Sequence, residues 1–487
     1  MEGFSRRKFL VSTAASAGLA LSPRSLRAQN ASSPTLLIAS ETALSPIPRD
    51  FLGLSYESSQ LGHAEFFSAK NAQLAGFLRA LGTGVLRIGG NTSEYAFWTP
   101  NAAAPATPTP DAGVAGPDPG HKIPPSTATT PQAIRNLREF LDLTGWNAIY
   151  GLNFGKGTAS QAAEEAAFVS QTLGDRLLAF QLGNEADLFH TNGIRPANYS
   201  FSDFAKEWEH FRRAIIKKVP NAKFAGPDTA GTSAWLDQFA HKFHNEVDLL
   251  TTHYYAEGPP SNPAMTIERL LQPSPRWQAA VPKIEAAMAA THKPYRLSET
   301  NSCYGGGKED VSNTFASSLW ALDLMFQVLS FGGSGINFHG GGYGWYSPIV
   351  GTQQNGFVAR PEYYALRLMA QLTGGRMVAS RMLDNPNPLV AAYAARDAKG
   401  RLAAVILNKD ADTDLHLTVR ASSAGDAVQV QRLIAPSLID EQDTTLGAAP
   451  VGASGAWQSQ SQETLHPSAD NVQCRIPRGS AALLQWR

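Results

Sequence analysis

The sequence lacks a net charge, which limits the partners that it can have. Its 41 Lys and Arg residues balance its 41 Asp and Glu residues, so the formal net charge at pH 7 is zero. Nucleic acids and acidic membranes are bound by basic surfaces, and no block of like charges indicates an interaction tail. We therefore expect no nucleic acid and no membrane among the partners, whereas the oligomeric state stays open.

Cysteine and long apolar runs are also scarce. Cys303 and Cys474 are the only cysteines in 487 residues, and we expect two free, partly buried thiols, although an exported protein could pair them. No apolar run is long enough to span a bilayer, which takes about 20 residues. Hydrophobic residues nevertheless make up 43% of the chain, so we expect a large buried core.

The N-terminus is typical of an export signal. Residues 5–10 read Ser-Arg-Arg-Lys-Phe-Leu, which matches the twin-arginine pattern, and the apolar stretch 9–21 follows. Ala28 offers a small residue at a cleavage point. The alternative is a basic tip on an ordinary N-terminal helix. We exclude residues 1–28 from the fold and expect a mature protein in the periplasm or outside the cell.

Short apolar runs alternate with longer amphipathic stretches between residues 48 and 375. The runs are 52–56, 85–88, 148–153, 177–182, 224–226, 247–253, 295–298 and 335–339. Fully apolar short runs are typical of strands that are buried on both faces of a parallel sheet. Eight such strands alternating with helices predict a (β/α)8 TIM barrel. A doubly wound sheet is the alternative, but no glycine-rich phosphate-binding motif follows the first run.

Outside residues 48–375 the pattern changes. Residues 376–487 contain runs that alternate apolar and polar side chains, with a hairpin signal at 397–400, and predict an antiparallel β-sandwich domain. Residues 29–47 include a strand-like segment that we expect to join that sandwich. The connection 100–131 is rich in Pro, Ala and Thr, which excludes a regular helix or a central strand. It is either a surface insertion or a wall that shapes a substrate site.

Polar residues stand directly after several of the apolar runs. Glu185 follows the fourth run in Gly-Asn-Glu, and Glu299 follows the seventh in Leu-Ser-Glu. Active sites of barrels lie at the carboxyl ends of the strands. Burying a polar group there costs free energy unless the group is paired or has a function. Two carboxylates that face each other across a pocket suit glycoside hydrolysis. One such Glu alone would more simply be structural, but two on strands four and seven favour a catalytic pair.

These motifs resemble the retaining glycoside hydrolases of clan A. The resemblance implies that Glu185 is the general acid/base, that Asn184 binds the sugar 2-hydroxyl and that Glu299 is the nucleophile. It also implies that Arg87, His253 and Tyr255 bind or orient the groups around the nucleophile. Each of these last three residues has a structural interpretation as well, as a core histidine, a charge partner or a packing residue.

Within the clan, three motifs are similar to glycoside hydrolase family 79, which holds β-glucuronidases and heparanase-like enzymes. They are Leu-Arg-Ile-Gly-Gly-Asn at 86–91, Gln-Leu-Gly-Asn-Glu-Ala at 181–186 and Leu-Ser-Glu-Thr-Asn-Ser at 297–302. Family members also carry a trailing β-domain. Ala186 follows the acid/base, where heparanase-like members often have Pro, so the motif favours an exo-acting β-glucuronidase over an endo-acting heparanase. The aglycone is left open.

A glucuronidase has to hold the carboxylate of its substrate. We expect Tyr304, Tyr346 and the backbone N–H groups of 340–344, including Gly341, to do so, because neutral donors oppose the oxocarbenium-like transition state less than a cation would. Glu57 follows the first run and is a candidate acceptor for sugar hydroxyls. A flexible turn is the simpler interpretation of the glycine run.

The prediction is therefore a retaining β-glucuronidase that acts on a glucuronic-acid-containing glycan. A β-xylosidase or β-glucosidase of the same clan, or a non-catalytic carbohydrate-binding barrel protein, are the alternatives. The reaction needs no cofactor and no metal. The pair at His241 and His244 resembles metal ligands only faintly, because no third ligand is near in sequence, and we interpret it as a solvated helix face.

Overall fold

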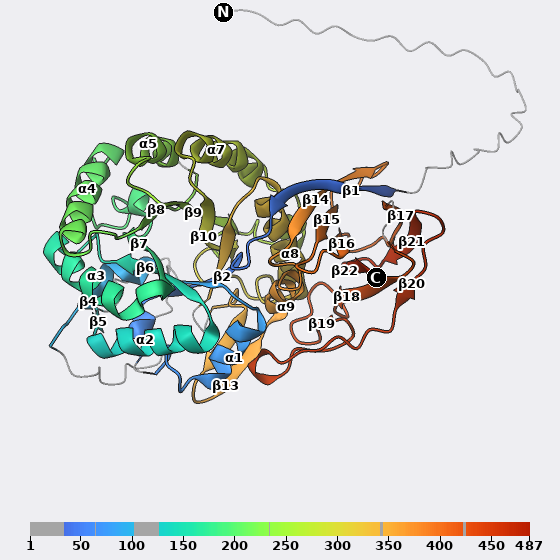
Figure 1. Cartoon of the computed structure of the whole chain (residues 1–487), viewed down its shortest axis with the longest axis horizontal. Coiled ribbons are helices and arrows are strands. Elements are labelled where there is room, and N and C mark those ends of the chain that lie inside the picture. Colours follow the sequence, from blue (N-terminus) through green and yellow to red (C-terminus); the bar gives the residue numbers. More distant parts are fainter. Residues whose placement is uncertain (1–33, 64, 102–125, 233, 341–343, 422–424) are drawn as a thin grey trace, which may run out of the picture.

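The computed structural model describes residues 34–487 except 64, 102–125, 233, 341–343 and 422–424. The expected export signal, most of the proline-rich connection and Gly341 lie outside the described residues. Two bodies make up the described part of the chain, a ring of strands and helices and a curled β-sheet beside it (Figure 1).

Eight parallel strands close into a barrel, as the sequence predicts. In chain order they are β2 (Leu52–Glu57), β3 (Val85–Gly89), β6 (Asn147–Leu152), β7 (Leu177–Leu182), β8 (Phe224–Thr229), β9 (Leu249–Glu257), β10 (Tyr295–Cys303) and β11 (Gly335–His339). Each predicted apolar run contributes to one of them, and β11 pairs with β2 to complete the ring. The strands are buried on both faces, which explains why their sequences are apolar without alternation.

Helices surround the barrel (Figure 1). They are α1 (Ala72–Ala80), α2 (Pro131–Thr144), α3 (Ala159–Leu173), α4 (Phe201–Lys218), α5 (Ala234–Phe243), α6 (Ile267–Leu271), α7 (Pro275–Thr291), α8 (Phe315–Ser330) and α9 (Pro361–Met369). Local sequence fixes several of their ends: Thr130 caps α2 by accepting the Ala133 N–H, and Gly145 ends it with φ 74°. Among the described residues no helix is long and apolar enough to cross a membrane.

The proline-rich connection between β3 and α2 ends in a short strand. β4 (Ala96–Trp98) and β5 (Thr127–Thr129) form a two-stranded parallel sheet beside the barrel. The prediction that no central strand occurs between residues 100 and 131 agrees with this small sheet, because within the described residues β5 pairs with β4 alone. A second small sheet, the hairpin of β12 (Ile349–Thr352) and β13 (Gly356–Ala359), follows β11.

The C-terminal body is one continuous, mainly antiparallel sheet that curls around its own core. Its strands are β1 (Thr35–Pro46), β14 (Arg376–Leu383), β15 (Val390–Arg396), β16 (Leu402–Asn408), β17 (Leu415–Ala421), β18 (Val428–Ile434), β19 (Thr445–Leu446), β20 (Thr464–Leu465), β21 (Asn471–Ile476) and β22 (Ser480–Trp486). β1 lies between β14, to which it is antiparallel, and β17, to which it is parallel. Leu36, Ile406, Val419 and Trp486 come from different strands and share one apolar core, so the curled sheet encloses a core as a sandwich does.

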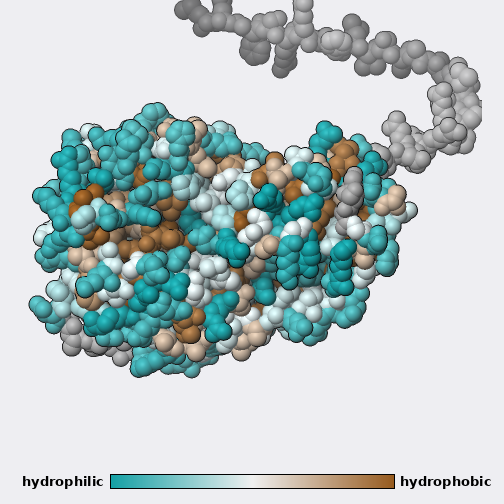
Figure 2. Space-filling model, in the orientation of Figure 1, coloured by the Kyte–Doolittle hydropathy of each residue, from teal (hydrophilic) through white to brown (hydrophobic). Residues whose placement is uncertain are grey.

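The two bodies meet along α8, which is buried over almost its whole length. Asp323 of α8 forms a buried ion pair with Lys409 at 2.5 Å and accepts a hydrogen bond from the Tyr393 hydroxyl at 2.6 Å. The Tyr393 ring stacks on Phe326 at a centroid distance of 4.6 Å. Hydrophilic residues cover most of the face shown in Figure 2, with smaller apolar areas between them. Both cysteines are free, as expected.

Candidate active site

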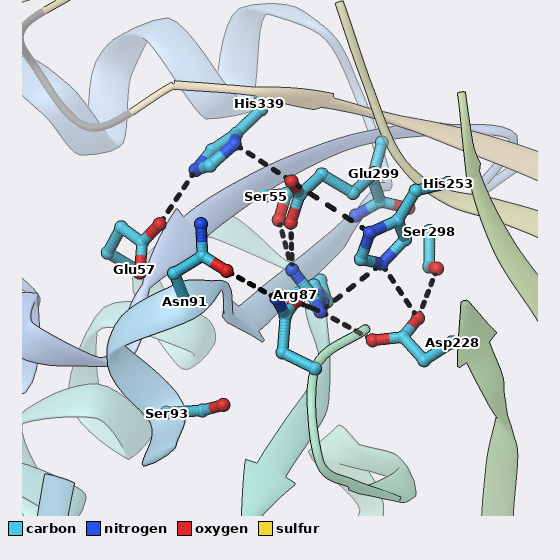
Figure 3. A network of polar contacts seen from close by, with 12 residues as sticks. Ser55, Glu57, Arg87, Asn91, Ser93, Asp228, His253, Ser298, Glu299 and His339 are labelled. Carbon is cyan, nitrogen blue, oxygen red and sulfur yellow. Dashed lines mark hydrogen bonds and ion pairs between the residues drawn. The ribbon is translucent and has the colours of Figure 1, made fainter. Parts of the chain in front are cut away.

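Four predicted site residues, Glu57, Arg87, His253 and Glu299, lie in one polar network at the barrel strands (Figure 3). Arg87 lies on β3, Asn184 and Glu185 directly follow β7, and His253 and Tyr255 lie on β9. Glu299 lies inside β10 rather than beyond its end, because residues 299–303 continue to pair with 253–257 of β9. Side chains that are far apart in sequence are thereby brought into one polar network.

The two glutamates face each other. One carboxylate oxygen of Glu185, one of Glu299 and a ring nitrogen of His253 all lie within 4.8 Å of one another. Glu185 has φ 51° in the left-handed region, and its backbone N–H donates to the Asp228 carbonyl at 2.9 Å. The Glu185 side chain is 13% exposed and that of Glu299 is 6% exposed. Glu185 is therefore the more open of the two carboxylates.

Arg87 is the centre of the network and is 1% exposed. Its guanidinium donates to the side-chain oxygens of Ser55 at 3.0 Å, Gln181 at 2.9 Å, Asn184 at 2.7 Å, Asp228 at 2.5 Å and Glu299. A guanidinium has five N–H donors in a rigid plane, so one buried Arg can fix several acceptors at once. The positions of Asn184, Asp228 and Glu299 are thus coupled through a single side chain.

Glu299 is held ionised by the cations around it. Burial alone would raise its pKa, but His339, His253 and Arg87 outweigh burial and hold the pKa of Glu299 well below its usual range. His339 Nδ1 lies 3.2 Å from Glu299 Oε1, and Arg87 donates to Oε2. The Tyr255 hydroxyl donates to Oε1 at 2.7 Å. Both carboxylate oxygens are thereby fixed.

His253 bridges Glu185 and a carboxylate that the sequence analysis missed, Asp228 of β8. His253 Nδ1 lies 2.8 Å from Glu185 Oε1, and Nε2 lies 3.1 Å from Asp228 Oδ1. Burial lowers the pKa of His253, but Asp228 and Glu299 outweigh burial and raise that pKa to about 10. The imidazole is therefore positively charged at neutral pH.

A second cluster borders Glu299 on the side of β2 and β11. His339 lies 2.8 Å from the Tyr255 hydroxyl and stacks on Tyr346 at a centroid distance of 5.6 Å. Glu57 Oε1 lies 3.6 Å from His339 Nε2, while Glu57 Oε2 accepts two hydrogen bonds from Thr92. Burial raises the pKa of Glu57. The predicted site residues Glu57 and Tyr346 therefore lie against His339, and His339 in turn contacts Glu299.

Tyr304 lies at the rim of the site. It is 39% exposed, and its ring meets that of Tyr255 edge-on at a centroid distance of 6.4 Å. The Gly340 N–H, which the sequence analysis offered as a donor for a substrate carboxylate, is already donated to the Ser55 carbonyl at 2.9 Å. That part of the prediction is wrong, because Gly340 continues the pairing of β11 with β2. Gly341 lies outside the described residues.

Glu94 is a second buried carboxylate that the sequence analysis missed. Its oxygens accept the backbone N–H groups of Asn184 at 2.8 Å, Phe154 at 3.0 Å and Gly155. Burial raises the pKa of Glu94, and these N–H groups oppose the rise. Glu94 accepts the backbone N–H of Asn184 and so fixes the position of the Asn184-Glu185 turn relative to the barrel.

Glu185, His253 and Glu299 form the only group within the described part of the chain whose ligand atoms lie close enough for a metal ion. Their polar atoms are already engaged, since both ring nitrogens of His253 face carboxylates and Arg87 donates to Glu299. These three residues therefore resemble a pair of carboxylates beside protein cations more than they resemble a metal centre. His241 lies in the last turn of α5 and His244 directly follows the helix; Nδ1 of each ring faces a backbone carbonyl, and Nε2 of His244 faces the side-chain amide of Asn245.

Comparison with known proteins shows a likeness to glycosyl hydrolases. Residues 130–325 match the model of the glycosyl hydrolase family 79 N-terminal domain, which confirms the resemblance to that family. A β-glucuronidase of Aspergillus niger is 28% identical over 340 residues, which are 64% of this chain and 61% of that protein. A β-glucuronidase of Neurospora crassa is 25% identical over 57% of this chain and 54% of its own length. The chain thus spans less than two thirds of these relatives.

Solved structures show the same fold. A 4-O-α-L-rhamnosyl-β-D-glucuronidase from Fusarium oxysporum superimposes with a TM-score of 0.72 at 18% identity, covering 93% of this chain and 100% of that one. An α-L-arabinofuranosidase from Thermotoga petrophila has a TM-score of 0.69 at 14% identity, with coverage of 93% and 100%. At these identities the likeness concerns the barrel and its accessory sheet.

Replacing Glu94 by Gln should destabilise the protein. Both carboxylate oxygens face backbone N–H groups, so the amide nitrogen of Gln would place a donor against a donor. We expect a loss of about 1–3 kcal/mol in the free energy of unfolding, the cost of an unsatisfied buried group, seen as a thermal midpoint several degrees lower.

Glu165→Gln is the matched control for Glu94→Gln. Glu165 is equally buried, but its one described donor is the Tyr150 hydroxyl at 2.7 Å, and burial raises its pKa to about 7. The Gln oxygen can still accept that bond, so this variant should lose less than about 1 kcal/mol. Equal losses in the two variants would contradict the assigned role of Glu94.

Proposed function

We propose that this chain, which carries the glycoside hydrolase family 79 domain, is a retaining β-glucuronidase that releases terminal β-linked glucuronic acid by double displacement. The observation that carries the proposal is the separation of the Glu185 and Glu299 oxygens, within 4.8 Å of each other. Retaining glycosidases place their two carboxyl groups about 5–5.5 Å apart, whereas inverting enzymes need about 6.5–9.5 Å to admit a water. The β-glucuronidases to which the chain is similar support the choice of sugar.

Glu299 is the proposed nucleophile. In the first step an oxygen of Glu299 attacks the anomeric carbon while the bond to the leaving group breaks, which forms a covalent glycosyl-enzyme. A nucleophile has to be ionised before it attacks, and the cations of His339, His253 and Arg87 provide that condition. Tyr255 and Arg87 bind the two oxygens and hold the carboxylate in a fixed orientation.

Glu185 is the proposed general acid and base. In the first step it gives its proton to the glycosidic oxygen, and in the second it removes a proton from the water that attacks the anomeric carbon. Its larger exposure suits a group that has to reach both the leaving group and incoming water. Asn184 Oδ1 accepts from Arg87, and one Nδ2 hydrogen is donated to Asn91 at 3.1 Å. The second Nδ2 hydrogen is available for the sugar 2-hydroxyl.

The substrate carboxylate is assigned to Tyr304 and Tyr346, together with backbone N–H groups of the segment that follows Gly340. Tyr346 lies beside His339 and Tyr304 beside Tyr255, and both of these neighbours contact Glu299. Glu57 lies near the same wall and is assigned to sugar hydroxyls. Neutral donors hold a carboxylate without adding positive charge beside an anomeric centre that itself becomes positive.

The site of action is proposed to be outside the cytoplasm. Residues 1–28 carry the twin-arginine pattern followed by an apolar stretch and Ala28, an order that is typical of an export signal. A glucuronic-acid-containing glycan in the periplasm or outside the cell is the substrate that such a location offers.

Two variants test the division of roles. Glu299→Gln should abolish turnover of every glucuronide, because no nucleophile is left. Glu185→Gln should lose about 10²–10⁴-fold on an alkyl glucuronide, which needs a proton on its leaving oxygen, and far less on a 2,4-dinitrophenyl glucuronide, which does not. Steady-state kinetics with both substrates measure this. Equal losses on the two substrates in Glu185→Gln would show that Glu185 is not the acid.

Substrate choice tests the two tyrosines. Tyr304→Phe and Tyr346→Phe should each lower kcat/KM for p-nitrophenyl β-D-glucuronide by roughly 5–150-fold, which corresponds to a lost hydrogen bond of about 1–3 kcal/mol to a charged group. The matching glucoside has no carboxylate and should change far less. If both glycosides lose activity equally, the tyrosines do not read the carboxylate. If the unmodified protein prefers the glucoside or the xyloside, the proposed sugar is wrong.

A further inference from the structure

Asp228 is fully enclosed by protein donors beside the proposed catalytic pair. It lies on β8 and is 1% exposed, so it has no surface with which to touch a sugar. Its oxygens accept from Arg87 at 2.5 Å, Ser298 at 2.6 Å and Gln181 at 2.6 Å, and Oδ1 lies 3.1 Å from His253 Nε2. Figure 3 shows its carboxylate pointing to His253 and Arg87. His253 contacts Glu185, and Arg87 contacts Glu299. Any effect of Asp228 on the reaction must therefore pass through these two side chains.

The contact with Asp228 determines which nitrogen of His253 carries a proton. A carboxylate accepts hydrogen bonds only, so Nε2 has to be protonated, and Nδ1 is left facing Glu185 at 2.8 Å. A neutral imidazole with its proton on Nε2 would accept at Nδ1 and hold the acid proton of Glu185. A charged imidazole instead donates from Nδ1 to the Glu185 carboxylate. The charge on His253 therefore decides whether it binds the proton of Glu185 or stabilises Glu185 after the proton has left.

We propose that Asp228 is a positioning residue for the reaction, which keeps His253 protonated on both ring nitrogens so that Nδ1–H donates to Glu185 once Glu185 has given up its proton. This inference rests on the acid role proposed for Glu185. In the first step the Glu185 O–H bond breaks, and the proton goes to the glycosidic oxygen. In the second step Glu185 takes a proton from water. His253 keeps both of its protons throughout.

The charges around His253 support this assignment. The imidazole faces Glu185 after β7, Asp228 on β8, Glu299 on β10 and Arg87 on β3, the last at 3.5 Å. Three carboxylates near the ring against one guanidinium favour the charged ring, and Asp187 adds a further attraction. The pKa of His253 is raised from 6.5 to about 10, against the effect of burial, and Asp228 is the strongest of the groups that raise it. The charge is therefore present at neutral pH and is lost only as the pH rises through about 10.

Asp228→Asn tests the proposal directly, because it removes the negative charge and keeps the shape. We expect the pKa of His253, followed by ¹⁵N NMR of the imidazole, to fall by about 1–3 units, the usual effect of losing a contacting opposite charge. Asp187→Asn is the matched control. Asp187 belongs to the turn that follows Glu185 and bonds the Ala230 N–H at 3.1 Å, so the same chemical change there should move the His253 pKa much less.

Kinetics supply the second readout. In Asp228→Asn, kcat/KM for an alkyl glucuronide should fall at least about tenfold more than for the 2,4-dinitrophenyl glucuronide, because only the former depends on proton donation. This ratio separates a role in positioning the acid from a loss of folded protein, which would lower both rates equally. Equal losses together with an unchanged His253 titration would overturn the proposal.

If Asp228→Asn fails to fold, the unmodified protein still tests whether His253 is charged. Its ¹⁵N spectrum at pH 7 should show His253 with both ring nitrogens protonated, and a neutral ring at pH 7 would overturn the proposal. Because this titration needs no substrate, it measures the charge on His253 independently of the proposed glycosidase function. A charged His253 in a protein that cleaves no glycoside would leave the Asp228 contact in place and reject the proposed function.

Discussion

One buried cation, Arg87, is the constraint on which the rest of the site depends. Moving a charge from water into a protein interior is costly, and the cost is recovered only when anions and hydrogen-bond acceptors surround the charge. Arg87 meets this requirement with Asp228, Glu299, Asn184 and neutral acceptors, all within hydrogen-bond distance. Because these partners come from different strands, the requirement to neutralise Arg87 fixes the relative positions of the groups that the proposed reaction needs.

The same electrostatic arrangement distinguishes the two glutamates. Glu299 is nearly closed off and faces Arg87, His253 and His339, so it remains a carboxylate. Glu185 is more open and contacts one ring nitrogen of His253. A double-displacement glycosidase requires one carboxylate that is always charged and one that gains and loses a proton. In this account the difference arises from the number of cations that each side chain meets.

The barrel and the placing of the two glutamates at one site could be predicted from the sequence, because both leave local signals. Buried parallel strands are short apolar runs, and Glu185 and Glu299 directly follow two of them. Asp228 follows the fifth run, 224–226, but Pro227 separates it from that run, and a proline is disfavoured in a central strand, so the sequence does not mark Asp228 as a strand residue. Glu94 lies in a short 3-10 turn after β3, and nothing in its sequence marks it as buried.

Pairings across the barrel are also beyond what local sequence can give. Arg87 and Asp228 are 141 residues apart in the chain, and their contact follows from the closure of the barrel. The use of the Gly340 N–H in strand pairing was likewise invisible before the register of β11 on β2 was known. Such features depend on three-dimensional position, whereas the identity of the two glutamates depends mainly on where the strands end.

The most direct test of the account is the configuration of the sugar when it first leaves the enzyme. One oxygen of Glu185 lies within 4.8 Å of one oxygen of Glu299, a spacing that suits retaining rather than inverting enzymes, so we expect the proposed reaction to proceed through two inversions. Proton NMR of p-nitrophenyl β-D-glucuronide hydrolysis, recorded before mutarotation, should show β-glucuronic acid as the first product. The α-anomer appearing first would contradict the account, because it would require a single direct displacement by water.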